Sequence, residues 1–320
     1  MKTILLDTDP GVDDAMALLF LHRHPAARLL GITTVFGNAE VETTTRNALH
    51  LCERFGIAAP VARGAARPLR REPRGAAVEV HGEDCLGNLG VAGHGARAAD
   101  ARPAHRFIVD ALRAHPGEVS LLALGPLTNL ALALAEAPEI AGLAREVVVM
   151  GGAFGIGGQG GNVSPVAEAN MLSDPHAADA VFTAAWPVSI VGLDVTHRVL
   201  MDPAAFERLR EQGGAEGEFI WRASRHYVDF YGRYLGVQGC YVHDASAAAF
   251  VLAPELFDTR AGPVRVVDEG LAVGQTIQRA TGRRYLQGEA WQGLPDQRVC
   301  SAVQADAVLD LFMGTLRAQG

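Results

Sequence analysis

The sequence predicts an α/β fold with a mostly parallel central sheet flanked by helices, an open arrangement of the Rossmann-like kind. Short apolar segments typical of strands alternate with segments of helical periodicity from residue 3 to residue 193. The segment 147–150 is apolar at every position, which is typical of a strand buried on both faces. We treat residues 1–320 as a single domain of this class.

Runs of apolar and β-branched residues mark the strands, which we expect at 3–6, 29–35, 119–124, 147–150 and 188–193. Apolar residues at helical spacing mark helices between them, expected at 12–22, 42–55, 107–114, 127–135 and 177–184. The first helix stops near Pro25 and the second at Gly56, because these residue types interrupt helices.

Stretches rich in Gly, Pro, Arg or mixed polar residues are expected as loops at 63–102, 151–161 and 213–238, the last with a helix over 219–231. The final third predicts short β segments and a closing helix, at 264–267, 272–277, 298–303 and 305–316. Polar residues follow the ends of several predicted strands, where ligands bind in parallel sheets.

Composition excludes several classes of protein. Hydrophobic residues make up 49% of the chain, enough for a large core, and the net charge of -8 with no basic segment to offset it argues against a nucleic-acid partner. No stretch of about 18 uncharged apolar residues predicts a membrane span. Asp7 interrupts the first apolar run, so no signal peptide is expected.

The cysteines Cys52, Cys85, Cys240 and Cys300 are far apart in the sequence and lack CxxC spacing. This pattern indicates reduced, mostly buried thiols rather than a disulfide frame or a zinc site. Together with the absence of a signal peptide, it predicts a cytoplasmic protein.

A cluster of carboxylates is the strongest functional signal. Asp7, Asp9, Asp13 and Asp14 follow the first predicted strand within eight residues. Clustered carboxylates require a compensating charge, and their hard oxygens favour Ca²⁺ or Mg²⁺. The alternative is an acidic cap on the next helix. That alternative explains Asp13 and Asp14, but not Asp7, Asp9 or the turn at Pro10 and Gly11.

Two other interpretations fit less well. Residues 155–160 match G-x-G-x-x-G after a strand, but no helical face begins there, so a mobile substrate loop is the better interpretation. Asp7-x-Asp9 after a first strand is also the opening of haloacid-dehalogenase phosphohydrolases. Here Pro10 and Gly11 follow instead, and Lys2 is the only lysine available for a phosphate.

Further polar groups allow two interpretations each. Asn162, Glu168 and Asn170 are suited to pair with vicinal hydroxyls, yet turns and caps also use such residues. Asp244 opens an Ala-rich helical segment, where an aspartate is often only a cap. Its neighbour His243, when considered alone, is more often structural than catalytic, and His81 in the loop 63–102 has the same ambiguity.

Taken together, the motifs resemble those of the nucleoside hydrolases, the inosine–uridine preferring ribohydrolases. The run from Asp7 to Asp14 resembles the family signature DxDPGxDD. Five further blocks follow in the family's order and spacing, at 33–38, 125–129, 150–152, 162–170 and 243–244. The resemblance extends from residue 3 to about residue 316, and it implies the same fold.

The resemblance also implies residue roles. A Ca²⁺ would be bound by Asp9, Asp14, Asp244 and the main-chain carbonyl of Leu124, and Asp9 would be the general base. His243 would lie near the leaving base and donate a proton, as an imidazole titrating near neutrality can. The ribose would contact Asp13, Asn38, Met150, Asn162, Glu168 and Asn170. Asp7 would support the loop by accepting main-chain N–H groups.

One position departs from the family pattern. Many relatives carry an aromatic residue where this chain has Ala169, so the base needs another stacking partner. That partner could be Tyr231, Tyr234, Phe154 or His81. His243 favours a member that acts on both purine and pyrimidine ribosides, or mainly on pyrimidines.

The resemblance thus implies Ca²⁺-dependent hydrolysis of ribonucleosides to ribose and a free base, for salvage, by a homodimer or homotetramer. A non-catalytic, calcium-dependent nucleoside or ribose sensor is the alternative, and Ala169 is its only support.

Overall fold

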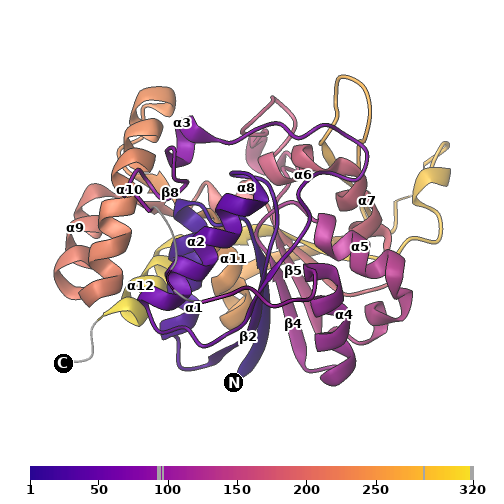
Figure 1. Cartoon of the computed structure of the whole chain (residues 1–320). Coiled ribbons are helices and arrows are strands. Elements are labelled where there is room, and N and C mark those ends of the chain that lie inside the picture. The colour runs from indigo at the N-terminus through magenta and orange to yellow at the C-terminus, as the bar shows by residue number, and fades with distance from the viewer. Residues whose placement is uncertain (92–94, 96, 284, 318–320) are drawn as a thin grey trace.

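The computed structural model describes residues 1–91, 95, 97–283 and 285–317. Its centre is an eight-stranded sheet with the strand order β3-β2-β1-β4-β5-β6-β12-β9 (Figure 1). All neighbouring strands are parallel except the pair β12 and β9. The strands are β1 Lys2–Thr8, β2 Ala27–Thr34, β3 Val61–Arg63, β4 Val119–Ala123, β5 Glu146–Met150, β6 Val188–Val191, β9 Phe257–Gly262 and β12 Gln297–Val303. The predicted mostly parallel α/β fold is confirmed.

Nine longer helices lie in the described part of the chain, on the faces of the sheet or, for α9 and α10, against other helices: α1 Val12–Arg23, α2 Val41–Arg54, α4 Ala104–Ala114, α5 Thr128–Glu136, α7 Pro175–Thr183, α9 Pro203–Gln212, α10 Gly214–Leu235, α11 His243–Leu252 and α12 Ala305–Leu316. The short elements are α3 Val78–His81, α6 Ala169–Ser173, α8 Leu193–Thr196, the pair β7 Leu200–Met201 and β8 Cys240–Tyr241, and the pair β10 Val264–Val266 and β11 Thr276–Gln278. In Figure 1 the chain begins at the lower edge of the sheet, and α3, α6 and α8 lie over the upper part.

Two hydrophobic cores lie on opposite faces of the sheet. One contains the buried sides of α1, α2, α9, α10, α11 and α12, and the other those of α4, α5 and α7. The strands contribute alternate residues to each core, as the two-residue period of a strand requires: Ile4 and Leu6 to the first, Leu5 to the second. Burial on both faces explains why the central strands are apolar throughout.

The register of the parallel strands brings the polar strand ends to one edge. Asp7 of β1 pairs with Ala123 of β4, so Asp9 and Leu124 emerge beside each other. Met150 ends β5 next to Val191 of β6. The candidate site therefore forms at the carboxyl edge of the sheet, as the sequence predicted.

Several predicted boundaries were wrong. Residues 213–238 are not a mixed loop, because α10 is a continuous helix over most of them. Its glycines suggested a loop, but a Cβ at Gly217 would lie 2.1 Å from the Leu209 carbonyl, so this glycine permits α9 and α10 to pack closely. The strand predicted at 188–193 is β6, which ends at Val191, and α8 begins at Leu193.

Other elements were missed or displaced. The predicted loop 63–102 contains α3, and it begins at the end of the unpredicted edge strand β3. The strand expected at 272–277 is β11, three residues long and shifted toward the C-terminus. The antiparallel edge strand β9 was not predicted, because its four central residues are exposed and carry no apolar pattern.

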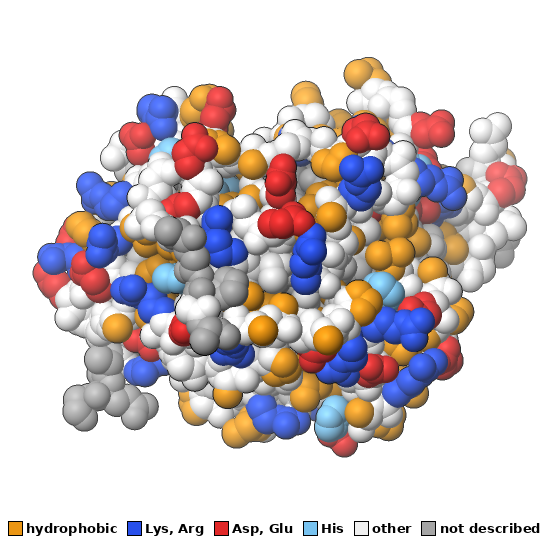
Figure 2. Space-filling view, viewed as in Figure 1, with side chains coloured by type: hydrophobic (Ala, Val, Ile, Leu, Met, Phe, Trp, Pro, Cys, Tyr) orange, Lys and Arg blue, Asp and Glu red, His pale blue; other side chains and the backbone are white. Residues whose placement is uncertain are grey.

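The four cysteines are buried free thiols, which confirms that prediction. Among the described helices, none combines the length and apolar character needed to cross a membrane. On the face drawn in Figure 2, basic and acidic side chains are interspersed rather than gathered into one basic patch.

The C-terminal helix α12 packs against the first core through a contact between its Phe312 and Phe20 of α1. Their ring centroids are 5.5 Å apart, and both side chains are almost fully buried. We expect Phe312→Ala to lower the free energy of unfolding by about 3–5 kcal/mol, because it leaves a cavity that the core cannot refill. Urea denaturation measures this loss. Leu286→Ala, at a fully exposed position, should change stability by less than about 0.5 kcal/mol.

Candidate active site

The turn between β1 and α1 places its carboxylates inside the protein. Asp14 lies in the first turn of α1, and its carboxylate accepts hydrogen bonds from the Gly11 N–H at 2.9 Å, the Asp9 N–H at 3.2 Å and the Thr8 hydroxyl. The helix-cap alternative therefore describes part of what Asp14 does. It does not describe the whole role of Asp13, whose carboxylate also accepts from the Tyr227 hydroxyl of α10.

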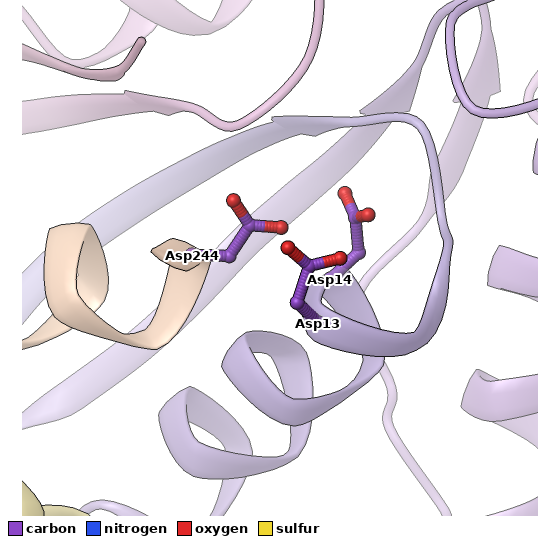
Figure 3. Close-up of side chains that lie close together, drawn as sticks. All are labelled: Asp13, Asp14 and Asp244. Carbon is purple, nitrogen blue, oxygen red and sulfur yellow. The ribbon is translucent and has the colours of Figure 1, made fainter. Parts of the chain in front are cut away.

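Asp13, Asp14 and Asp244 converge from two helices (Figure 3). A ligand oxygen from each lies within 4.8 Å of the other two, and all three side chains are buried. Burial raises the pKa of each of the three carboxyls above its ordinary value. The nearby charge of Asp13 raises the pKa of Asp14 and of Asp244 further. A cation would remove this penalty.

Two buried carboxylate oxygens near this cluster have no hydrogen-bond partner, Asp9 Oδ1 and Asp13 Oδ1. Buried polar atoms are normally satisfied, so these two are available for a ligand. The converging ligand atoms of this cluster are carboxylate oxygens, which suit a hard divalent cation such as Ca²⁺ or Mg²⁺. The residues present therefore fit a divalent cation, with Asp13 in the mutually close group where Asp9 was predicted.

Asn38 ties Asp9 to Asp14. Its main-chain N–H donates to Asp9 Oδ2 at 2.8 Å, and its side-chain amide donates to Asp14 Oδ2 at 3.0 Å. Asp9 adjoins the cluster of Asp13, Asp14 and Asp244 but is not one of the three mutually close groups. Burial and then the charge of Asp14 raise the pKa of Asp9.

The Leu124 carbonyl, a predicted metal ligand, accepts a hydrogen bond from the Asn170 amide at 2.7 Å. The same amide donates to the Met150 carbonyl at 3.2 Å. Asn170 thus joins the ends of β4 and β5, and three predicted site residues from separate elements lie together.

Glu168 and Asn162 do perform cap and turn chemistry. The buried Glu168 carboxylate caps α6, accepting from the N–H groups of Asn170, Met171 and Gly152 at 2.9–3.1 Å. Asn162 is exposed, and its Oδ1 accepts from the Ala169 N–H at 3.1 Å. Their contact with a sugar stays a prediction.

The opposite side of the site is aromatic and carries His243. One ring nitrogen, Nδ1, lies 2.8 Å from the Thr196 hydroxyl, and Nε2 lies 2.8 Å from the Tyr231 hydroxyl. Burial, followed by the nearby His197 and His81, lowers the pKa of His243 well below 6.5. Desolvation therefore favours the neutral form of this imidazole.

A chain of hydroxyls connects this histidine to the carboxylates. The Tyr231 hydroxyl lies 3.4 Å from that of Tyr227, which donates to Asp13 Oδ2 at 3.3 Å. Tyr227 was not among the predicted site residues. It lies four positions before Tyr231, on the same face of α10, and that spacing could have identified it. Thr196, also missed, follows β6 at the carboxyl edge of the sheet.

His81 also points into the site. Its Nδ1 accepts from the Val12 N–H at 3.2 Å, so the ring proton is on Nε2, and burial lowers its pKa to about 4. Its ring stacks on Tyr227 at 5.3 Å. A Cβ at Gly11 would lie 2.7 Å from His81 Nδ1, so the close approach of this ring requires glycine there.

Asp7 supports the turn differently from the prediction. Its Oδ1 accepts from the Thr33 hydroxyl at 2.5 Å and the Asn129 amide at 2.7 Å, not from main-chain N–H groups. Burial raises its pKa to about 7. The glycine-rich segment that follows β5 is fastened by Asp194, whose carboxylate accepts from the N–H groups of Phe154 and Ile156.

Comparison with known proteins agrees with this geometry. A sequence model of the inosine-uridine preferring nucleoside hydrolases matches residues 4–310. Probable uridine nucleosidase 1 of Oryza sativa subsp. japonica is 39% identical over 317 residues, covering 98% of this chain and 96% of that protein. The inosine-uridine preferring nucleoside hydrolase of Leishmania major is 39% identical over 279 residues, covering 86% of this chain and 87% of that protein.

A solved plant nucleoside hydrolase has the same fold, with a TM-score of 0.95, 34% sequence identity and 99% of each chain covered. The shared motifs, the common fold and the gathering of their residues at one edge of the sheet all lead to the same assignment. The chain belongs to the inosine-uridine preferring nucleoside hydrolase family, and it is an enzyme that hydrolyses N-glycosyl bonds of ribonucleosides.

Proposed function

We propose that the protein is a Ca²⁺-dependent ribonucleoside hydrolase that releases ribose and a free nucleobase for salvage. The buried oxygen cluster of Asp9, Asp13, Asp14 and Asp244, facing the buried pair His243 and Tyr231, is the observation that carries this proposal. The cluster supplies hard ligands and a base, and the aromatic side supplies a proton donor, which are the two requirements for breaking an N-glycosyl bond with water.

Asp9, Asp14, Asp244 and the Leu124 carbonyl would hold the cation. When bound, Ca²⁺ supplies Lewis acidity toward the attacking water and a template for the sugar hydroxyls. Asp9 Oδ1 is buried without a partner, and it accepts the proton that the water loses. The water oxygen bonds to C1′ as the bond from C1′ to the base nitrogen breaks. The electron pair of the broken bond leaves with the base.

The sugar is oriented by groups from four strand ends. Asp13 and Asn38 stand beside the cation ligands, Asn170 lies across the ends of β4 and β5, and Met150 ends β5. Glu168 and Asn162 complete the ribose contacts in this proposal. Carboxylate and amide oxygens around the ring stabilise the positive charge that develops as the bond breaks.

His243 protonates the leaving base. Its Nδ1 lies 2.8 Å from the Thr196 hydroxyl, which orients the ring for this transfer. Tyr231 fixes the ring by its contact with Nε2, and Tyr231 with His81 lines the base side in place of the aromatic residue absent at Ala169.

A substrate panel tests the proposal. Uridine, inosine, cytidine and adenosine are incubated with the enzyme, with Ca²⁺ or with a chelator, and ribose and free base are quantified. We expect release from at least uridine or inosine, with loss on chelation. No release from any ribonucleoside would refute it, and tight nucleoside binding without ribose formation over hours would favour the sensor. Uridine is the first choice, because the rice relative is named a uridine nucleosidase and the Leishmania relative acts on inosine and uridine by name.

Calcium binding should also appear in the stability of the protein. At a free concentration 100 times the dissociation constant, Ca²⁺ is expected to add about 2.7 kcal/mol to the free energy of unfolding, because it binds only the folded cluster. Thermal unfolding with and without chelator measures this shift. In Asp244→Asn the shift should shrink strongly, since one buried carboxylate ligand is gone. An unchanged shift in that variant would contradict the proposed ligand set.

The proposal includes a cytoplasmic location, supported by the four free thiols, and a homodimer or homotetramer, which light scattering of the purified protein would test.

A further inference from the structure

Two loops that meet at the candidate active site are joined by one buried amide, the side chain of Asn47. This residue lies on α2 and is 0% exposed. Its Nδ2 donates to the Pro10 carbonyl at 3.1 Å and to the Asp84 carbonyl at 2.9 Å. Its Oδ1 accepts from Arg46 Nη2 at 3.3 Å. Both amide hydrogens are therefore used to bridge segments that are far apart in the sequence.

The first bridged segment is the turn that carries the carboxylates. Pro10 lies between Asp9 and Gly11, at the point where the chain reverses from β1 into α1. A buried carbonyl here needs a donor, and Asn47 provides one from outside the turn. The position of this carbonyl fixes the direction in which Asp9 leaves the strand.

The second bridged segment is the loop 82–91, which Asp84 organises from within. Its carboxylate accepts four main-chain N–H bonds, from Leu86, Asn88, Gly90 and Val91, at 2.7–3.3 Å. Cys85 and Asn88 are held at φ 63°, a conformation that residues other than glycine seldom adopt. A loop with this geometry keeps its shape only while its anchors persist.

His81 connects that loop to the site. Its carbonyl accepts from the Gly87 N–H at 2.8 Å, and its imidazole accepts from the Val12 N–H at 3.2 Å. Loop and turn thus meet through two links, the His81 imidazole and the Asn47 amide. The His81 imidazole faces the proposed substrate. The Asn47 amide therefore provides the link between loop and turn that does not involve the substrate.

We infer that Asn47 is a positioning residue, which sets the spacing between the Asp9–Gly11 turn and the loop 82–91 that follows His81. The cation and ribose end of the site is then kept in register with the base end by a group that touches neither. The effect on turnover rests on the proposed function, whereas the effect on the loop does not.

Asn47→Asp tests this directly. The side chain keeps its shape, but the NH₂ group that donates to the two carbonyls becomes a carboxylate oxygen, which can only accept. We expect kcat/KM for uridine to fall about 10²-fold, because a small misplacement of site groups has effects of this size. Hydrogen exchange of the amides in 82–91 should quicken at least about tenfold. Asn47→Ala, which removes the donors without adding a charge, should move both quantities in the same direction if the aspartate variant fails to fold.

Gln297→Glu is the matched control. Gln297 is also 0% exposed, and its Nε2 donates to the carbonyls of Phe182 and Ala184 at 2.9 and 3.4 Å, while its Oε1 accepts from the Val188 N–H. It bridges the opposite edge of the sheet, where β6 and β12 begin. Its substitution should lower the thermal midpoint yet leave kcat/KM within about twofold and exchange of 82–91 unchanged.

The inference is overturned if the amides of 82–91 exchange at the wild-type rate in both Asn47→Asp and Asn47→Ala. It is also overturned if Gln297→Glu reduces kcat/KM as much as the Asn47 variants do. If the wild-type protein hydrolyses no ribonucleoside, the proposed function fails. The exchange comparison, made without calcium or substrate, still decides the role of Asn47.

Discussion

Asp9→Asn is expected to reduce kcat/KM for uridine by at least about 10⁴-fold with the fold intact, because it removes the proposed general base and a carboxylate of the proposed cation site. The asparagine can still accept from the Asn38 N–H, as Asp9 Oδ2 does at 2.8 Å, so the turn keeps its main fastening. The amide cannot take a proton from water. Steady-state kinetics and circular dichroism of the two proteins measure the effect.

Asp179→Asn provides the control for this prediction. Asp179 lies on α7, where its carboxylate accepts from Arg265 at 2.7 and 2.9 Å, away from the carboxyl edge of the sheet. It should keep kcat/KM within about twofold. Substantial turnover by Asp9→Asn, beyond any trace of wild-type enzyme, would assign the base to another carboxylate. Asp13 is then the first candidate, since its Oδ1 is also buried without a partner.

His243→Gln is expected to separate substrates by their leaving groups. Uridine and inosine need a proton on the departing base, so kcat/KM for them should fall about 10²–10⁴-fold. A 4-nitrophenyl riboside needs none, and its rate should change by less than about threefold. Both are measured on the same enzyme preparation, so a general folding defect would appear in both rates.

Tyr231→Phe refines this test. It removes the hydroxyl that lies 2.8 Å from His243 Nε2 and keeps the ring that packs in the core. A smaller loss with the same dependence on leaving group is expected, because the acid remains but its orientation is looser. Equal losses for uridine and the nitrophenyl riboside in His243→Gln would exclude His243 as the acid.

The sequence predicted the parallel sheet and the carboxylate-rich edge because these depend on local patterns. Apolar strand segments and the dense run from Asp7 to Asp14 are visible without any tertiary information. The helix α10 was partly missed for the opposite reason. Gly217 has low helical propensity, and the close packing against Leu209 that requires it exists only in the folded protein.

The protonation of His243 was beyond sequence reasoning for a similar cause. An isolated imidazole titrates near neutrality, and only the surrounding core shows that desolvation lowers this pKa. Asp7 is comparable, since its partners Thr33 and Asn129 come from a neighbouring strand and from α5. In both cases the surroundings of the side chain come from elements that are distant in the sequence.

Asp13 belongs both to the carboxylate cluster and to the chain of hydroxyls that ends at His243. The two halves of the site are therefore joined by hydrogen bonds, and we expect their titrations to be coupled. The limbs of a pH–rate profile will report the whole set rather than Asp9 or His243 singly. A substitution at either end should move both limbs, so the profile of Tyr227→Phe, which cuts the chain in the middle, is the one in which acid and base would titrate independently.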